Sequence, residues 1–260
     1  MMNMRNPKGN IGVGITTYES EEYFKELYNS LPFDHIDECV VVNGGKPYKG
    51  DYPKCDWIQH KENHYPSVCR NDALRYLQGR DIEHFFIIED DMIIKDEFTL
   101  NKYIEHSIES GLEYLCFVST GDGSGTVGRR TPRLTVECKS GRKMDFYRNM
   151  CNEFTYRSKT MLDKCGLYDE SFRHMFDVDS VYRMAQTMLT SPFWWFPDIH
   201  NSDDYVMNNP NATSRLQAGG RRDEELPQEF QMFQATHGVH VPNILNLKEE
   251  YVIEHLRLLA

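Results

Sequence analysis

The chain lacks several features that mark common protein classes. None of its hydrophobic runs approaches the roughly 18 residues that a membrane-spanning helix needs, so no membrane insertion is expected. The opening stretch, MMNMRNPKGN, has no apolar core of a signal peptide. Its seven cysteines form no CxxC pair, which argues against a zinc site and favours reduced thiols in a cytoplasmic compartment. Neither a GxGxxG fingerprint after the first strand-like run nor a Walker lysine motif is present.

Composition and charge set broad limits on the partners. A chain of 260 residues with 40% hydrophobic content suits one large domain or two closely packed halves. The net charge of −11 argues against a general nucleic-acid coat protein. Basic residues nevertheless gather in the stretch 129–143, RRTPRLTVECKSGRK, which begins with Arg129, Arg130 and Arg133. This stretch is either a solvated basic loop or a patch for an anionic partner.

The first half alternates strand-like and helix-like segments. Apolar, β-branched runs predict strands, and amphipathic segments that start at Ser20 and Ser67 or end at Gly79 and Gly111 predict helices. The expected strands are 11–16, 39–42, 56–59, 85–88 and 114–118, and the expected helices are 21–31, 67–77 and 98–110. Such alternation predicts an α/β fold with a mostly parallel sheet flanked by helices.

The second half is less regular. Residues 146–156 and 161–183 are expected to be partly helical, and 245–259 forms an acidic helix candidate. The segment GDGSGTVG at 121–128 follows a late strand and opens no obvious helix, so we interpret it as a loop, with a phosphate cradle as the alternative.

Three carboxylates end a buried strand candidate. The sequence FFIIEDDMII at 85–94 carries Glu89, Asp90 and Asp91 after four large apolar residues. Like charges at a strand end need a cation or hydrogen-bond donors, and Mg²⁺ and Mn²⁺ prefer carboxylate oxygens. An acidic surface turn is the alternative. Because ligands in parallel sheets bind beyond the carboxyl ends of the strands, we expect the EDD to lie near Thr16, Tyr18 and Asn43.

Several motifs occur in the order of one known family. They are GITTYES at 14–20, VVVNGG ending at Gly45, NHYPSVCRNDAL at 63–74, FIIEDD ending at Asp91, KCGLYDESFRHMFDVDSVYRMA at 164–185 and FPDIHNSDD around His200. Together they resemble the GT-A glycosyltransferases, particularly the family-2-like group, over most of the chain. The match has departures: Asn43 stands for an acid of VVDDGS, Tyr65 for a glycine, Glu89 for an aspartate and Phe176 for a glutamate.

The resemblance implies a role for each matching residue. Thr16, Tyr18 and Asn43 would line the nucleoside pocket, and Asn63 and Arg70 belong to the donor-binding motif that also contains Ser67 and Asn71. Asp91 would contact the metal directly, Glu89 and Asp90 would serve the ribose or metal-bound water, and His200 would be a further metal ligand. Asp177 would be the catalytic base of an inverting enzyme.

Alternatives remain for several of these residues. Asp177 and Asp179 could instead cap a helix that starts near Val181. A lone histidine such as His200 is often merely hydrogen bonded in the structure. Trp194 and Trp195 are interpreted as core, with sugar stacking as the alternative.

The resemblance also implies an activity. The expected enzyme moves a sugar from a nucleoside diphosphate sugar, with UDP favoured, to an acceptor hydroxyl, and it uses Mn²⁺ or Mg²⁺. Residues 1–125 would form the nucleotide-sugar-binding half and 126–260 the acceptor and catalytic-base half of one continuous domain.

The acceptor is less defined. Arg129, Arg130 and Arg133 point to an anionic acceptor such as DNA with a hydroxymethylated base, the substrate of phage-type DNA glycosyltransferases. A surface or capsular glycan is the alternative. From other classes, a nucleotidyltransferase or a non-catalytic nucleotide-sugar binder is weighed against a glycosyltransferase.

Overall fold

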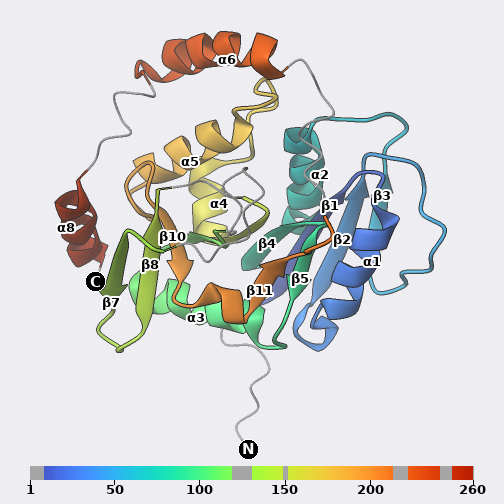
Figure 1. Ribbon diagram of the computed structural model, residues 1–260, viewed down its shortest axis with the longest axis horizontal. Coiled ribbons are helices and arrows are strands. Elements are labelled where there is room, and N and C mark those ends of the chain that lie inside the picture. The colour runs from blue at the N-terminus through green and yellow to red at the C-terminus, as the bar shows by residue number, and fades with distance from the viewer. Residues whose placement is uncertain (1–8, 119–130, 149–151, 213–221, 241–247, 260) are drawn as a thin grey trace, which may run out of the picture.

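A six-stranded sheet forms the centre of the molecule (Figure 1). The computed structural model describes residues 9–118, 131–148, 152–212, 222–240 and 248–259. The strand order is β3-β2-β1-β4-β9-β6, in which β1 to β4 run parallel and β9 is antiparallel to both β4 and β6. The strands are β1 Ile11–Thr17, β2 Glu38–Asn43, β3 Asp56–Gln59, β4 His84–Glu89, β6 Tyr114–Cys116 and β9 Phe154–Ser158. The predicted α/β architecture with a mostly parallel sheet is therefore confirmed.

Helices cover both faces of this sheet. Because side chains alternate between faces along a strand, neighbouring residues such as Val41 and Val42 enter different hydrophobic clusters. One cluster includes side chains of α1 (Glu21–Ser30) and α3 (Thr99–Ser110). The other includes side chains of α2 (Pro66–Gln78), α4 (Lys159–Cys165) and α5 (Phe176–Gln186). The result is three layers, with the sheet buried between the two sets of helices.

The packing of α2 against β1 depends on glycine. A Cβ added to Gly14 would lie 2.7 Å from the Ala73 Cβ, closer than two carbon atoms can approach. Gly12, on the same face of β1, would similarly meet Leu77 at 2.9 Å. The glycines of the first strand therefore let α2 approach the sheet, and α2 carries Arg70 toward the end of β1.

Smaller elements complete the second half. A three-stranded sheet contains β7 (Leu134–Glu137), β8 (Lys143–Tyr147) and β10 (Phe196–Ile199), and a two-stranded ribbon pairs β5 (Met92–Ile94) with β11 (Val206–Asn208). The 3₁₀ turns are η1 (Phe33–His35) and η2 (Ser202–Asp204), and the last helices are α6 (Arg222–His237) and α8 (Glu249–Leu259). Within the described ranges, no helix combines the length and the apolar character needed to cross a membrane.

Some local predictions were wrong. Residues 146–156, expected to be partly helical, contain the end of β8 and the start of β9. Strand β9 lies between β4 and β6 and is buried on both faces, so its sequence FTYRS shows no alternation that would have identified a strand. Helix α2 begins at Pro66 with Tyr65 as its N-cap, not at Ser67, because proline suits the first helical turn. Helix α5 begins at Phe176, which places Asp179 inside it.

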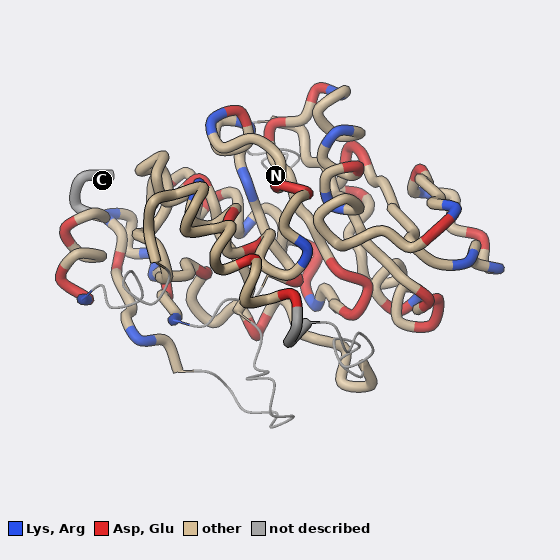
Figure 2. Tube along the Cα trace, turned by 90° about the horizontal axis from the view of Figure 1, so that it is seen from above, with Lys and Arg blue, Asp and Glu red and all other residues tan. Residues whose placement is uncertain are grey.

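Two other predictions concern parts of the chain that lie outside the described residues. The segment 121–128 belongs to one such range, and so does the predicted division between residues 125 and 126. Charges of both signs are distributed along the part of the trace that the structure describes (Figure 2).

Candidate active site

The carboxyl ends of three parallel strands form one edge of the site. Strand β1 ends at Thr17, β2 at Asn43 and β4 at Glu89, and Thr16 is paired in register with Glu89. The Thr17 hydroxyl donates a hydrogen bond to Asp90 Oδ2 at 2.5 Å, and Thr17 also contacts the Tyr48 hydroxyl. Thr17 was missed by the sequence motif, which pointed to Thr16 and Tyr18. The parallel pairing thus brings the first-strand motif and the EDD together.

Tyr18 and Asn63 border the glycine turn that follows β2. A Cβ placed on Gly44 would lie 3.5 Å from Asn63 Oδ1 and 3.7 Å from Tyr18 Cδ2. Both side chains are exposed, with Tyr18 at 41%, so both are open to a ligand. Three of the predicted donor-binding segments therefore meet at this turn.

Asn43 has a structural role in the same turn. It is fully buried, and its amide donates to the Lys46 carbonyl at 2.8 Å and to Gln59 Oε1 at 3.1 Å. Its Oδ1 accepts from the Gly45 N–H at 2.8 Å. These bonds fix the glycine turn, and the expected contact between Asn43 and a nucleobase stays a prediction.

Arg70 joins the two sides of the site. Its guanidinium donates to Glu89, to Asp177 Oδ1 at 2.6 Å and to the Asn152 carbonyl at 3.1 Å. Burial opposes its charge, but the Asp177 and Glu89 carboxylates outweigh burial and raise the pKa of Arg70. The Arg70 side chain is 2% exposed, whereas Asp177 is 17% exposed and can be reached by a ligand.

Two opposing effects act on the pKa of Asp177. Burial raises the pKa of Asp177, and the Arg70 guanidinium opposes this rise. Asp177 is the second residue of α5, and Met175 occupies the N-cap position.

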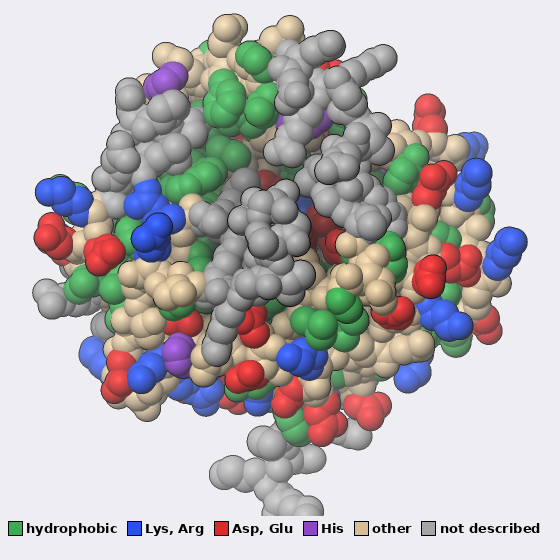
Figure 3. All heavy atoms as spheres, viewed as in Figure 1, with side chains coloured by type: hydrophobic (Ala, Val, Ile, Leu, Met, Phe, Trp, Pro, Cys, Tyr) green, Lys and Arg blue, Asp and Glu red, His purple; other side chains and the backbone are tan. Residues whose placement is uncertain are grey.

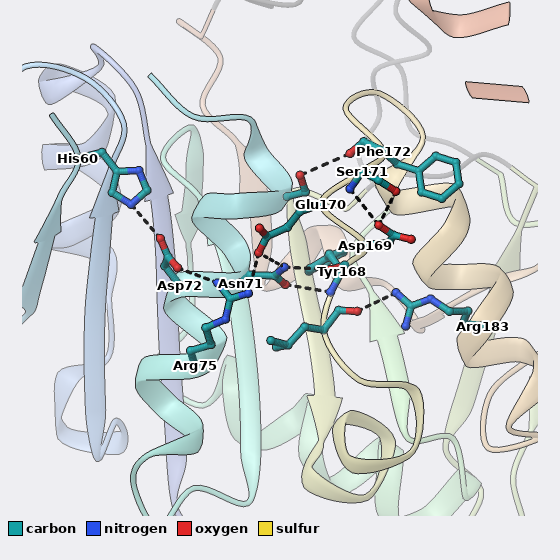
Figure 4. A network of polar contacts seen from close by, with 12 residues as sticks. His60, Asn71, Asp72, Arg75, Tyr168, Asp169, Glu170, Ser171, Phe172 and Arg183 are labelled. Carbon is teal, nitrogen blue, oxygen red and sulfur yellow. Dashed lines mark hydrogen bonds and ion pairs between the residues drawn. The ribbon is translucent and has the colours of Figure 1, made fainter. Parts of the chain in front are cut away.

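A polar network holds the segment before α5 against α2 (Figure 4). The Asn71 amide donates to the Tyr168 carbonyl and its Oδ1 accepts from the Tyr168 N–H, both at 2.9 Å. Asn71 also donates to Glu170 Oε1 at 2.8 Å, and Arg75 pairs with the same carboxylate at 2.7 Å. The Arg-Asn pair of the α2 motif thus has two roles: Arg70 contacts Asp177, and Asn71 fixes the chain that leads to it.

Asp91 lies among other acids without a full set of partners. Burial, reinforced by the charges of Glu89, Glu153 and Asp90, raises the pKa of Asp91 to about 8. Its Oδ1 is buried and has no hydrogen-bond partner. A hard divalent cation would neutralise this group, so the surroundings of Asp91 fit the predicted metal.

Glu153 was missed by the sequence analysis. It directly precedes β9, and because β9 runs antiparallel to β4, its beginning lies beside the end of β4. The Glu89 N–H donates to the Glu153 carbonyl at 2.7 Å, and the Glu153 carboxylate accepts from Asn208 Nδ2 at 2.5 Å. No sequence signal marks Glu153, because its place depends on recognising β9 as a strand.

The part of the chain that the structure describes contains no complete metal site. Among the described side chains, no group of three or more His, Cys, Asp or Glu is arranged to hold a metal ion. Glu89 pairs with Arg70 and Asp90 accepts from Thr17, while the His200 imidazole is 3.0 Å from Asp145 Oδ2. The charge environment of Asp91 and the missing ligand cluster point in different directions. A metal site at Asp91 would therefore require neighbouring carboxylates to turn from their present partners toward the unpartnered Asp91 Oδ1.

The basic stretch is only partly described. Arg129 and Arg130 lie outside the described residues, and Arg133 is exposed just before β7. Arg142 is paired with Glu105 and Glu109 of α3 at 2.8 and 2.9 Å, so its charge is already balanced. Charged side chains of both signs are interspersed over the face seen in Figure 3.

Neither the tryptophans nor a surface hollow beside α1 belongs to the predicted site. Trp195 is 3% exposed and is part of the core, as expected, and Trp194 packs against the second cluster. A hollow of about 640 Å³ lies over α1 and the turn before β3 and contains none of the predicted site residues. Its lining residues are Glu21, Glu22, Lys25, Tyr28, Asn29, Gly50, Asp51 and Tyr52.

Solved structures share this fold. No protein-family model and no curated protein matches the chain. The S. aureus TarS 1-349 structure in complex with UDP-GlcNAc superposes with a TM-score of 0.60 at 16% identity, over 96% of this chain and 71% of that one. The mannosyltransferase PcManGT from Pyrobaculum calidifontis, in complex with GDP-Man and Mn²⁺, gives 0.58 at 15%, over 97% and 74%. GalNAc-T7 with UDP, GalNAc and Mn²⁺ gives 0.56 at 10%, over 78% and 44%. The likeness establishes a GT-A type of glycosyltransferase fold.

Proposed function

We propose that the protein is a glycosyltransferase that moves a sugar from a nucleoside diphosphate sugar to an acceptor hydroxyl. The observation that carries the proposal is the bridge from Glu89 through Arg70 to Asp177. It connects the carboxylates at the end of β4 with a partly exposed carboxylate from the second half of the chain. Transfer needs a cation at the departing diphosphate and a base near the acceptor hydroxyl. The carboxylates at the end of β4 would serve the cation, and Asp177 would serve as the base. The bound nucleotide sugars of TarS and PcManGT support the donor class.

The donor is proposed to bind along the ends of β1, β2 and β4. Tyr18 and Asn63 offer exposed side chains at the glycine turn after β2, and Thr16 and Asn43 are the further proposed contacts of the nucleoside. UDP is the favoured nucleotide, and the UDP complexes of TarS and GalNAc-T7 support this choice. Asp91, with His200 as a further ligand, would hold Mn²⁺ or Mg²⁺. When bound, such a cation acts as a Lewis acid for the departing diphosphate.

Asp177 is proposed as the catalytic base. Its raised pKa makes the carboxylate more basic than an exposed aspartate, while the Arg70 guanidinium at 2.6 Å favours its ionised form at neutral pH. The carboxylate would accept the proton of the acceptor hydroxyl as that oxygen bonds to the sugar. This role corresponds to an inverting route, in which the base would lie on the side of the sugar opposite the departing diphosphate.

The acceptor is proposed to be anionic. Arg129, Arg130 and Arg133 supply positive charge early in the second half of an otherwise acidic chain. DNA with a hydroxymethylated base is the first candidate, and a surface or capsular glycan is the alternative.

A single-turnover experiment with labelled donor tests the proposal. Sugar transferred to an acceptor or to water with release of nucleoside diphosphate supports a glycosyltransferase. Release of sugar 1-phosphate, from cleavage between the two phosphates of the donor, would indicate a nucleotidyltransferase, and tight binding without turnover would indicate a nucleotide-sugar binder. Calorimetry with UDP, GDP and CDP in the presence of Mn²⁺ identifies the nucleobase of the donor. Binding of none of them would contradict the donor assignment.

A further inference from the structure

A carboxylate from α6 occupies the backbone turn that leads into α5. Glu229 Oε1 accepts from the Arg173 N–H at 3.0 Å and the His174 N–H at 3.2 Å. Its Oε2 accepts from the His174 N–H at 3.0 Å and the Met175 N–H at 2.8 Å. Glu229 is only 6% exposed, so these bonds are shielded from water. One side chain therefore satisfies three consecutive backbone donors.

These donors are directly connected to the proposed base. Met175 is the N-cap residue of α5, and Asp177 follows it within the first turn. The positive end of the helix dipole favours a negative charge at this place, and three N–H groups in a row form a concave anion site. By holding this backbone, Glu229 fixes where α5 begins and therefore where the Asp177 side chain is placed.

Independent contacts fix α6 in the same position. Phe233 is fully buried, and its ring lies 6.4 Å from Phe172 and 5.3 Å from Tyr182. His237, at the end of α6, contacts Asp179 Oδ1 at 2.7 Å. Helix α6 is thus attached to α5 and to the segment before it, so the Glu229 carboxylate is held rigidly.

We propose that Glu229 is a positioning residue for Asp177, acting through the N–H groups of Arg173, His174 and Met175. The inference rests on the proposed function of Asp177 as the base. Glu229 touches neither donor nor acceptor, and it holds the entry of α5 so that the Asp177 carboxylate meets both Arg70 and the acceptor hydroxyl. The consequence is that a residue distant in the sequence controls the rate of proton removal.

The test compares Glu229→Gln with Glu225→Gln. The introduced glutamine would keep one acceptor oxygen but would turn an NH₂ group toward backbone donors, which displaces the turn. Glu225 is a matched control on the same helix, because its carboxylate pairs with the side chains of Arg173 and His174, whereas that of Glu229 accepts from their backbone N–H groups. We expect kcat for sugar transfer to fall on the order of 10- to 100-fold in Glu229→Gln, which is the effect of a small misplacement of a reacting group. The affinity for UDP and the KM for the donor should stay unchanged, and Glu225→Gln should keep its kcat.

Hydrogen exchange gives a readout that does not depend on activity. Amides in the segment 172–178 should exchange faster in Glu229→Gln than in Glu225→Gln. Glu229→Asp retains the charge on a shorter side chain and is expected to recover part of kcat; if the Gln variant does not fold, this variant makes the same kcat and donor-affinity comparison.

The outcomes separate the two proposals. A kcat in Glu229→Gln equal to that of Glu225→Gln, or a parallel loss of donor affinity, overturns the positioning role. A wild-type protein that transfers no sugar overturns the proposed function, and the exchange difference then still decides whether Glu229 holds the segment of Asp177.

Discussion

At the scale of single residues, the site depends on how a few buried charges are paired. Arg70 is the central group, because it contacts carboxylates from β4 and from α5 and has almost no access to water. Removing one partner of a buried ion pair usually leaves the other charge uncompensated. Here, when Asp177 is neutralised, Glu89 still balances the charge of Arg70. Asp177 is paired with Arg70, whereas Asp91 lies among other acids. We therefore expect substitution by asparagine to affect the two residues differently.

Asp177→Asn should abolish transfer while leaving the nucleotide site intact. The amide can still accept a hydrogen bond from Arg70 but cannot take the proton of the acceptor. We expect kcat to fall about 100-fold or more, with UDP affinity unchanged by calorimetry. A residue that only starts the helix would show the opposite result, a stability loss of about 1 kcal/mol with kcat preserved. NMR analysis of the product anomer belongs beside the variant, since retained configuration would contradict a simple base role.

Asp91→Asn should stabilise the metal-free protein at high pH. The pKa of Asp91 is about 8 in the folded protein and near 4 when unfolded, so the unfolded state holds fewer protons between these values. Stability from this group therefore falls as pH rises from about 4 to about 8, and asparagine removes that loss. Thermal melts in EDTA should show a higher Tm for the variant at pH 8 and no gain at pH 4, on a scale of about 2–4 °C per kcal/mol.

Metal removal provides the complementary result. Mn²⁺ should raise the Tm of the wild type and not that of Asp91→Asn, because the cation binds the ionised carboxylate of the folded state. Equal stabilisation of both proteins by Mn²⁺ would contradict a metal role for Asp91, as would activity that is insensitive to EDTA.

At the scale of elements, the contact between β1 and α2 sets the geometry of the site. Strand β1 delivers Thr17 to Asp90, and α2 delivers Arg70 to Asp177, so any change in their spacing moves both pairs. The spacing depends on the glycines of β1 that face Ala73 and Leu77.

Gly14→Ala should separate these two elements. The new Cβ would lie 2.7 Å from the Ala73 Cβ, and in a packed core the overlap is expected to cost about 1–3 kcal/mol. Gly79→Ala is the matched control, because its Cβ would meet no atom closer than 3.4 Å and its φ is −71°. Chemical denaturation should show a lower midpoint for Gly14→Ala only, and UDP affinity should fall with it. Equal midpoints would show that α2 can shift without strain.

At the scale of the whole molecule, the chain is acidic and its basic stretch is partly neutralised within the fold. The Arg142 pairs with Glu105 and Glu109 remove one charge of that stretch from solution, and Arg133 remains exposed. Long-range attraction of the proposed anionic acceptor would depend on the cations of the stretch that Arg142 leaves, which include the exposed Arg133, Lys139 and Lys143.

Reversing Arg129, Arg130 and Arg133 to Glu should weaken acceptor binding and leave donor binding unchanged. For a polyanionic acceptor the wild-type KM should also rise steeply with added salt, and the slope should flatten in the triple variant. Lys159→Glu is a suitable control, since Lys159 is an exposed cation paired locally with Asp163. An acceptor KM that is independent of salt and unchanged in the triple variant would identify the stretch as a solvated loop.

The sequence by itself determined the architecture of the first half and the sheet edge at which the donor is proposed to bind. Alternating apolar runs and helix signals predicted β1 to β4 and their helices, and parallel pairing requires that their carboxyl ends meet at one edge. The local rules fail for β9, which is buried on both faces and thus has no alternating pattern. Glu153 was missed for this reason.

Only the tertiary structure decided which partners the site residues have. Arg70 and Asp177 are 107 positions apart, and the Glu229 contact with Met175 spans 54 positions, so no local pattern encodes either pair. Likewise Asn71, a motif residue without an assigned role, is tied to Tyr168 and Glu170 of a distant segment. Secondary structure follows from short-range periodicity, whereas burial of a charge requires a partner that the folded chain supplies from elsewhere, and that choice is made by packing.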